Sequence, residues 1–448
     1  MASAVGAPAP PAEPALPPGP TPRPIAVARF VLQPTRFLED CRRRYGSLFT
    51  LRLSAERTVV ITDDVEIVKQ VFTGDPQLLR AGEGNVVLRP LLGARSVLTL
   101  DGPEHLRQRR LLLPPFHGER MRYYREAMTE VAERHVERWP VGSAFPAHPS
   151  MQAITLEVIL RVVFGAEDER RLEQLAGPLR RLLDATGSRL RLLLLQATSS
   201  ERGPRSPWGR FRALMEPADR AIMEQIRARR SGEKRDDVLS LLLAAGDEEG
   251  RQLTDAELRD ELMTLLVAGH ETTATALSWT LERITRDPAV LARLVEEQSA
   301  GGDEYLDVVI KETLRLRPVV PAVVRHLAQP MELGDRRFPA GVNIAPSIYL
   351  LHRRHDLYPD PYAFRPERFL ERTPGTYEWI PFGGGIRRCL GASFALFEMK
   401  VVLSTILARA QLAATRNPAE RVTRRSVTFT PARGGRVLVE RLRPHTKR

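Results

Sequence analysis

Apolar residues recur at helical spacing along most of the chain, and polar or Pro/Gly-rich breaks separate the helical stretches. The clearest helix begins near Leu253, where Thr254 and Glu257 have the spacing of a capping box. Apolar residues then follow at helical intervals, at Leu258, Leu262, Leu265 and Leu266. Asp287-Pro288 ends the pattern, because the residue before a proline disfavours helical geometry. We therefore expect a long helix that ends near Arg286.

Shorter elements surround this helix. The pattern predicts further helices at 101–113, 121–138, 152–164, 304–316 and 390–410. β-Branched and aromatic residues predict a hairpin at 47–62 and short strands at 322–327 and 342–348. The segment 189–215 joins two apolar helical patches through a Gly/Pro/Ser-rich loop, which fits either a mobile lid or a surface helix pair. Helices dominate, and we find no domain linker beyond residue 24.

The ends and the charge narrow the class of protein. Residues 1–24 are rich in Ala and Pro and predict a disordered lead, since such a segment has little to bury. No apolar run approaches the roughly 18 residues of a membrane span, so we expect a soluble, cytoplasmic protein without a transmembrane anchor. The net charge of +12 comes mostly from arginines that are interspersed with acidic residues, without a nucleic-acid-binding signature. This favours a basic docking face for an acidic protein over nucleic-acid binding.

One of the two cysteines stands in a context suited to chemistry. The segment FGGGIRRCLG, 382–391, places Cys389 between three glycines and a predicted helix. Glycines let a backbone approach a flat cofactor, and the N-terminal end of the helix favours a thiolate. A thiolate ligand donates charge to haem iron and assists O–O cleavage. The alternative from these residues alone is a buried structural cysteine beside a glycine turn.

The full pattern around Cys389 resembles the haem-binding signature of the cytochrome P-450 family. It comprises Phe382, Gly385, Arg387, Cys389 and Gly391. The resemblance implies a single, mainly α domain over residues 25–448, the triangular cytochrome P-450 fold with small β-sheets near its N-terminal side. It also implies haem b as cofactor, with Cys389 as the axial ligand of the iron.

A second segment, AGHETT at 268–273, resembles the oxygen-binding segment of the same family. The Thr272 hydroxyl can bond the carbonyl of Ala268, which loosens the helix there. The resemblance implies that Gly269 lets the helix pass close to the haem and that Thr272 assists proton delivery, while Glu271 can feed protons to it. A threonine that merely tolerates a buried helix is the alternative for this segment taken alone.

Further matches concern folding and the haem propionates. Glu312 and Arg315 lie one helical turn apart, and the resemblance implies that Arg368 joins them in a structural triad. Propionates need cationic or hydrogen-bonding partners. The residues that match the propionate-binding positions of the family are His105, Arg109, Arg325 and Arg387.

The implied function is a monooxygenase that inserts one oxygen atom from O2 into a mostly apolar small molecule, of the fatty acid, terpenoid, steroid or polyketide class. Electrons from NAD(P)H would arrive through a reductase and an acidic ferredoxin or flavodoxin that docks near Cys389 on Arg107, Arg110 and Arg388. The expected pocket lining includes Val86, Val87, Leu265, Ala268, Val319, Val320, Val323 and the turn near Phe429. Two alternatives stay open: a peroxygenase or isomerase on the same fold, and a non-catalytic haem protein that binds a ligand.

Overall fold

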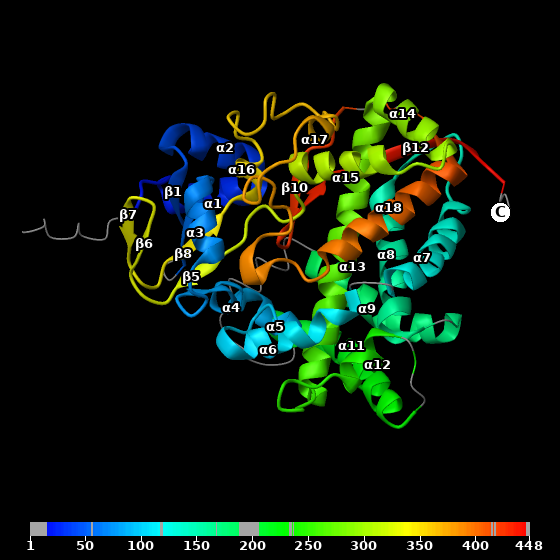
Figure 1. Ribbon diagram of the computed structural model, residues 1–448, viewed down its shortest axis with the longest axis horizontal. Helices are drawn as coiled ribbons and strands as arrows, with labels where there is room; N and C mark the ends of the chain where they lie inside the picture. Colours follow the sequence, from blue (N-terminus) through cyan, green and yellow to red (C-terminus); the bar gives the residue numbers. More distant parts are fainter. Residues whose placement is uncertain are drawn as a thin grey trace, which may run out of the picture.

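A long central helix, α13 (Asp255–Arg286), runs through a helical part of the molecule, and a small sheet lies beside that part (Figure 1). The computed structural model describes residues 16–444 except 55–56, 117–119, 167, 188–205, 233–234, 236, 414 and 416–417. Thr254 and Glu257 form the predicted capping box at the start of α13, and Asp287 caps its end. The sequence prediction for this helix is confirmed.

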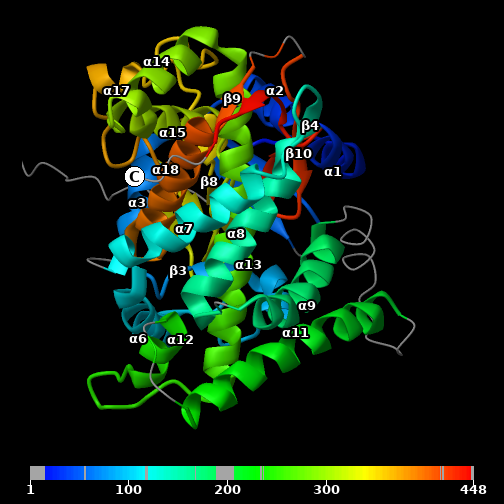
Figure 2. The same cartoon turned by 90° about the vertical axis from the view of Figure 1, so that its right-hand side faces the viewer.

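The helical part is organised around α13. Apolar side chains from the helices on its sides form the largest core. Helix α8 packs along α13, and α18 packs on α7 (Figure 2). The helices of this part are α6 (Gly102–Leu112), α7 (Arg120–Val136), α8 (Ala147–Phe164), α9 (Glu169–Gly187), α11 (Pro207–Arg230), α12 (Val238–Ala244), α14 (Pro288–Ser299), α15 (Glu304–Leu316) and α18 (Ala392–Arg409).

The main sheet has the strand order β1-β2-β8-β5-β3, in which only the β2–β8 pair is parallel. Its strands are β1 (Leu48–Arg52), β2 (Thr58–Thr62), β3 (Leu79–Arg80), β5 (Arg325–Leu327) and β8 (Asn343–Pro346). Apolar side chains on its two faces form two smaller cores. The helices near it are α1 (Arg23–Leu32), α2 (Pro34–Tyr45), α3 (Val65–Thr73) and α16 (Ile348–Leu351).

Smaller elements complete the described chain. Three further sheets pair β4 (Ala144–Pro146) and β9 (Ala410–Leu412) with β12 (Arg436–Leu442), β6 (Met331–Leu333) with β7 (Arg336–Phe338), and β10 (Val422–Arg425) with β11 (Thr428–Pro431). Short helices are α4 (Ala81–Gly84), α5 (Arg89–Leu92), α17 (Arg368–Glu371) and the 3-10 turns η1 (Val86–Leu88), η2 (Pro114–Phe116) and η3 (Gly385–Arg387). The main fold prediction, mainly α with small sheets, is confirmed.

The structure differs from the sequence prediction at the start of α8 and does not describe most of the predicted lid. Helix α8 begins at Ala147 rather than residue 152, because a proline at its third position costs no hydrogen bond within the first turn. The predicted lid or helix pair at 189–215 falls largely on 188–205, which lie outside the described residues, and its last part belongs to α11.

The N-terminal lead also differs from the prediction over its described part. Residues 1–15 lie outside the described residues. Pro17 is buried, and its carbonyl accepts the Thr50 hydroxyl at 2.6 Å. The Pro18 carbonyl accepts the Thr50 amide at 3.0 Å, and α1 begins at Arg23. Residues 16–24 are therefore packed against β1, because their carbonyls supply acceptors that an edge strand would otherwise lack.

Within the described residues, no single helix combines the length and apolar composition that crossing a membrane requires. Helices α8 and α9 meet those criteria only as a pair, bent by 115°.

Candidate active site

Cys389 lies on a loop that closes on itself just before α18. The Cys389 amide donates to the carbonyl of Phe382 at 2.9 Å. Inside the loop, Gly385 has a φ of +63°, and a Cβ there would lie 2.0 Å from the carbonyl oxygen of Phe72. A side chain at position 385 would strain the backbone and collide with α3, so this position requires glycine. The loop is therefore packed closely against α3 just before Cys389.

Cys389 is exposed, and open space lies beside its loop at Gly391. Its side chain is exposed, yet protein surrounds it closely enough that desolvation raises the pKa of the thiol. The Gly391 amide, Arg109 and Arg388 act in the opposite direction and lower that pKa. A Cβ added at Gly391 would meet no described atom within 4 Å. The loop thus borders open space at Gly391, and the donors and cations near the Cys389 sulfur favour a thiolate.

Helix α13 also exposes one small side chain in its middle. Ala268 is exposed, although Leu266 and His270 on the same helix are buried. The Thr272 hydroxyl donates to the Ala268 carbonyl at 2.5 Å, as its spacing predicts. A Cβ at Gly269 would lie 3.4 Å from the Ile159 side chain of α8, so this glycine sits at the helix–helix contact. The structure therefore places Ala268 on an open face and Gly269 against α8.

The four predicted propionate partners form one cluster of three arginines and a histidine. Burial and, after it, the nearby charges of Arg387, Arg109 and Arg325 together lower the pKa of His105 to about 3, so this side chain is neutral at pH 7. Burial and the charge of Arg387 lower the pKa of Arg325 to about 10. Burial likewise lowers the pKa of Arg387 to about 10, against the raising effect of Asp101. These mutual effects require that the four side chains lie close together.

Among the described residues, the ion pairs of this cluster involve a single carboxylate, that of Asp101. Arg387 donates to Asp101 at 2.6 Å. Arg325 is only 6% exposed, and its side chain donates to the Val324 carbonyl at 2.9 Å without an ion pair to any described carboxylate. Three arginines with one carboxylate between them suit a ligand that carries two carboxylates. The exposed cysteine, the open space at Gly391 and this cluster therefore fit the haem that the sequence implies.

Glu312, Arg315 and Arg368 come together as the sequence predicts. Glu312 and Arg315 are fully buried, and the Arg315 guanidinium donates to both Glu312 oxygens at 2.6 and 2.8 Å. Arg368 donates to Glu312 at 3.1 Å. Arg315 also donates to the carbonyls of His352 and Pro361 at 2.8 Å each. The group thus fixes α15 to the irregular segment ahead of the Cys389 loop.

Glu271 lies beside Thr272 in the chain, and its carboxylate contacts α8 and β10. Gln152 donates to Glu271 Oε2 at 2.8 Å. Glu271 Oε1 lies 3.6 Å from His148 Nε2 and 3.6 Å from Arg425 Nε, and it is buried without a hydrogen-bond partner in the described chain. Burial raises the pKa of Glu271, while Arg425 and Gln152 lower it. The carboxyl therefore keeps its proton to a higher pH than an exposed glutamate does.

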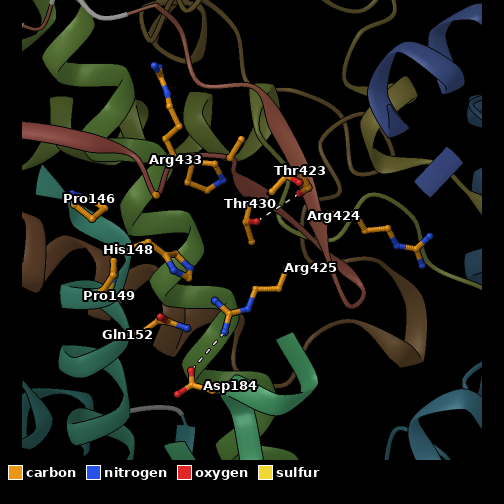
Figure 3. Close-up of a pocket in the computed structure, with 13 residues that line it drawn as sticks. Pro146, His148, Pro149, Gln152, Asp184, Thr423, Arg424, Arg425, Thr430 and Arg433 are labelled. Carbon is orange, nitrogen blue, oxygen red and sulfur yellow. Dashed lines mark hydrogen bonds and ion pairs between the residues drawn. The ribbon is translucent and has the colours of Figure 1, made fainter. Parts of the chain in front are cut away.

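An open pocket of about 510 Å³ lies next to these partners (Figure 3). Figure 3 shows Arg425 pointing toward Asp184, with an ion pair at 3.8 Å, and His148 and Gln152 on the neighbouring helix. The lining also includes Pro146, Pro149, Thr423, Arg424, Thr430, Pro431, Ala432, Arg433 and Gly434. The carboxyl of Glu271 thus has polar neighbours that reach a solvent-accessible pocket.

The expected substrate-pocket lining is partly accessible. Val86 and Val87 are 47% and 44% exposed, unusual for valines. Leu265, Val320 and Val323 are partly exposed, whereas Val319 is buried. Phe429 itself is a core residue, 2% exposed, and Val427 is the exposed residue of the nearby turn. At this turn, the side chain accessible to a substrate is therefore Val427 rather than Phe429.

The arginines predicted to dock a redox partner differ in their exposure and in their ion pairs. Arg107 is only 13% exposed and pairs with Asp247 at 2.7 Å and Glu257 at 2.9 Å. The expectation that it docks a partner is therefore wrong, because its charge already holds α6 to α13. Arg110 is 68% exposed and pairs with an exposed glutamate, and Arg388 is exposed. These two stay available to a partner.

The sequence reasoning missed several groups near these residues. It did not single out His148, Gln152 or Arg425 as neighbours of Glu271, nor Asp101 as the partner of Arg387. No spacing signal links them, because they lie on other elements and meet only in the folded chain.

Comparisons with known proteins agree with this geometry. The sequence model described as Cytochrome P-450 matches residues 17–437. A Mycobacterium tuberculosis protein provisionally named cytochrome P-450 135B1 is 45% identical over 438 residues, covering 96% of this chain and 92% of its own. Another from the same organism, provisionally named cytochrome P-450 138, is 41% identical and covers 92% and 93%.

Solved structures have the same fold. The crystal structure of the cytochrome P-450DA haem domain is 26% identical, with a TM-score of 0.82 over 96% of this chain and 98% of that one. Retinoic-acid-bound cyanobacterial CYP120A1, 24% identical, also has a TM-score of 0.82, over 95% and 99% of the two chains.

Proposed function

This chain belongs to the cytochrome P-450 family, and from that premise we propose that Cys389 is the thiolate ligand of its haem b and that its substrate is an apolar small molecule. The family makes the chain a haem monooxygenase, with NAD(P)H as the indirect electron source through redox partners. The observation that carries the assignment of Cys389 is its exposed position, on a loop packed against α3 and beside a cluster of arginines.

The residues around Cys389 would hold the cofactor. Haem with a thiolate ligand supplies the dioxygen activation and oxygen transfer. The Cys389 sulfur would ligate the iron, and the Gly391 amide would bond that sulfur and moderate its charge. The two propionates would be bound by His105, Arg109, Arg325 and Arg387. They would add negative charge to a cluster in which Arg387 already pairs with Asp101. Phe382, Gly385 and Arg387 hold the loop in shape.

Glu271 and Thr272 would transfer protons. The raised pKa of Glu271 suits a group that holds a proton to a higher pH than an exposed glutamate does and can then release it. The Thr272 hydroxyl lies on the next residue and bonds the Ala268 carbonyl, so a rotation about its side chain frees it to donate on the open face of α13. Thr272 would thus pass protons toward that face, and Glu271 would replace them.

Water in the pocket of Figure 3 would supply Glu271 with protons. The buried Oε1 atom lies between His148 and Arg425, at 3.6 Å from each, which is too long for hydrogen bonds and leaves this lone pair available. Arg425 also pairs with Asp184, a largely exposed residue. Movement of Arg425 toward Asp184 would let a water molecule reach Glu271.

The substrate and the partner follow from the remaining surfaces. The accessible apolar residues near 86–87, 320–323 and 427 offer few polar groups to a sugar or phosphate, so we propose an apolar substrate of the fatty acid, terpenoid, steroid or polyketide class. Arg110 and Arg388 would dock an acidic ferredoxin or flavodoxin near Cys389. A cytoplasmic location stays a prediction.

Product formation from an apolar compound panel tests this function. We expect turnover that requires O2, NAD(P)H, a reductase and a ferredoxin or flavodoxin together. Turnover supported by hydrogen peroxide alone would indicate a peroxygenase, and rearrangement without oxygen uptake an isomerase. Spectral binding of compounds with no turnover under any electron supply would indicate a ligand-binding haem protein instead.

A further inference from the structure

The irregular segment 93–101, between α5 and α6, contacts an acidic pair on α13 at one side. Glu261 Oε1 accepts the amide N–H of Val97 at 2.7 Å, and Asp260 Oδ2 accepts that of Arg95 at 2.9 Å. The Thr264 hydroxyl lies 2.7 Å from that of Ser96. The first turns of α13 thus supply acceptors to two amides of a segment that is neither strand nor helix.

The opposite side of the same segment binds Arg387. The Arg387 guanidinium donates to the Val97 carbonyl at 3.1 Å, to the Leu100 carbonyl at 2.7 Å and to Asp101 at 2.6 Å. Val97 is therefore bonded on both sides, through its N–H to Glu261 and through its C=O to Arg387. Arg387 is two residues before Cys389, so this residue links α13 to the cysteine loop.

The fit between the segment and α13 is close. Gly93 has a φ of +94°, and a Cβ there would lie 2.1 Å from the Asp260 carboxylate. Val97 and Ser96 are buried, and Glu261 is fully buried. A side chain at position 93 would therefore push the segment away from α13.

Glu261 is a costly residue to bury. Desolvation raises the pKa of its carboxyl well above the usual range, and the charges of Asp260 and Glu257 raise it further, while only the Val97 N–H lowers it. Its second oxygen has no hydrogen-bond partner in the described part of the chain. A buried carboxyl with a single protein hydrogen bond destabilises the fold, so stability does not explain why Glu261 is buried here.

We infer that Glu261 is a positioning residue for the cofactor, because it fixes the Val97 peptide whose carbonyl anchors Arg387. This inference rests on the proposed function, in which Arg387 binds a haem propionate. Glu261 itself touches neither substrate nor haem. It acts through Val97, and it sets where the Arg387 charge stands.

The test compares haem retention and reduction potential in variants of the haem-loaded protein. Glu261→Leu leaves the Val97 N–H without an acceptor, and we expect about tenfold faster haem transfer to excess apomyoglobin and a more negative reduction potential, since a cation moves away from the haem. Glu261→Gln keeps an acceptor oxygen and should stay close to wild type in both. Gly93→Ala displaces the same segment without altering a carboxylate and should resemble Glu261→Leu.

The control is Glu282→Leu, which removes another buried carboxyl of α13, one that binds Arg283 and the Glu420 amide. It should lower the unfolding temperature without changing the potential. If Glu261→Leu and Gly93→Ala shift haem loss and potential no more than Glu282→Leu, the inference is overturned. The carbon monoxide spectrum separates the two claims: thiolate ligation should persist in Glu261→Leu, whereas its absence in wild type would contradict the proposed function instead.

Discussion

The surroundings of Cys389 and those of Glu271 are built in opposite ways. On the Cys389 side, short bonds of 2.6–3.1 Å hold Arg387 to three acceptors, and a loop in which position 385 requires glycine fixes the cysteine. On the Glu271 side, His148 and Arg425 lie 3.6 Å from the carboxyl, beside an open pocket. The tight side suits a bound group that must not move, and the loose side suits water and protons that must.

The largest expected effect concerns the Glu312 group, which fixes α15 to the segment just ahead of the Cys389 loop. Glu312→Leu leaves Arg315 and Arg368 buried without their carboxylate, and removing one partner of a buried ion pair costs about 3–5 kcal/mol. We expect a fall in the unfolding temperature and faster haem loss, measured by calorimetry and absorbance. Glu371→Leu, whose ion pair with Arg365 is exposed, is the matched control and should change little. Equal stability of the two variants would contradict a structural role for Glu312.

The next effect concerns the loose side. Glu271→Gln removes the proton donor but keeps the shape and the contact with Gln152, and we expect product formation to fall roughly 100-fold, the lower end of general acid–base effects. Haem retention and the carbon monoxide spectrum should not change. Thr272→Ala should act similarly, and Thr272→Ser should restore most of the activity. Loss of haem in Glu271→Gln would show that the two sides are not separable.

Proton supply also predicts a pH dependence with a definite sign. Burial raises the pKa of Glu271, so the fraction that carries the proton falls, and turnover should fall, as pH rises through that raised value. Burial lowers the pKa of His148 to about 4, with Arg425 adding to the effect, so this neighbour is already neutral in that window. A pH profile of turnover should therefore lose its alkaline limb in Glu271→Gln. A limb that survives the substitution would assign it to another group.

The smallest effect tests the partner surface near Cys389. Charge reversal at Arg388 should slow the first electron transfer from an acidic ferredoxin about tenfold at low salt and much less at high salt, because exposed charges are screened. Arg107→Gln should lower stability through its pairs with Asp247 and Glu257 rather than slow electron transfer at low salt. Stopped-flow reduction rates at two ionic strengths separate the two arginines.

The same contrast explains what the sequence could predict. The Cys389 loop and the α13 motif are contiguous, so spacing alone indicates them, and the capping box at Thr254 predicts where α13 begins. Gln152 meets Glu271 across 119 residues, and Val97 meets Glu261 across 164. Neither contact leaves a local pattern, because each depends on how α8, α13 and the 93–101 segment pack. The prediction that Arg107 docks a redox partner was wrong for the same reason, since its carboxylate partners lie 140 and 150 residues away in the sequence.

The absorption spectrum of the reduced protein with carbon monoxide, in wild type and in Cys389→Ala, tests the central claim most directly. Wild type should give the spectrum that is characteristic of thiolate-ligated haem, and Cys389→Ala should lose it even where haem is still bound. An unchanged spectrum after removal of that sulfur, or a wild-type protein that takes up no haem, would contradict the assignment.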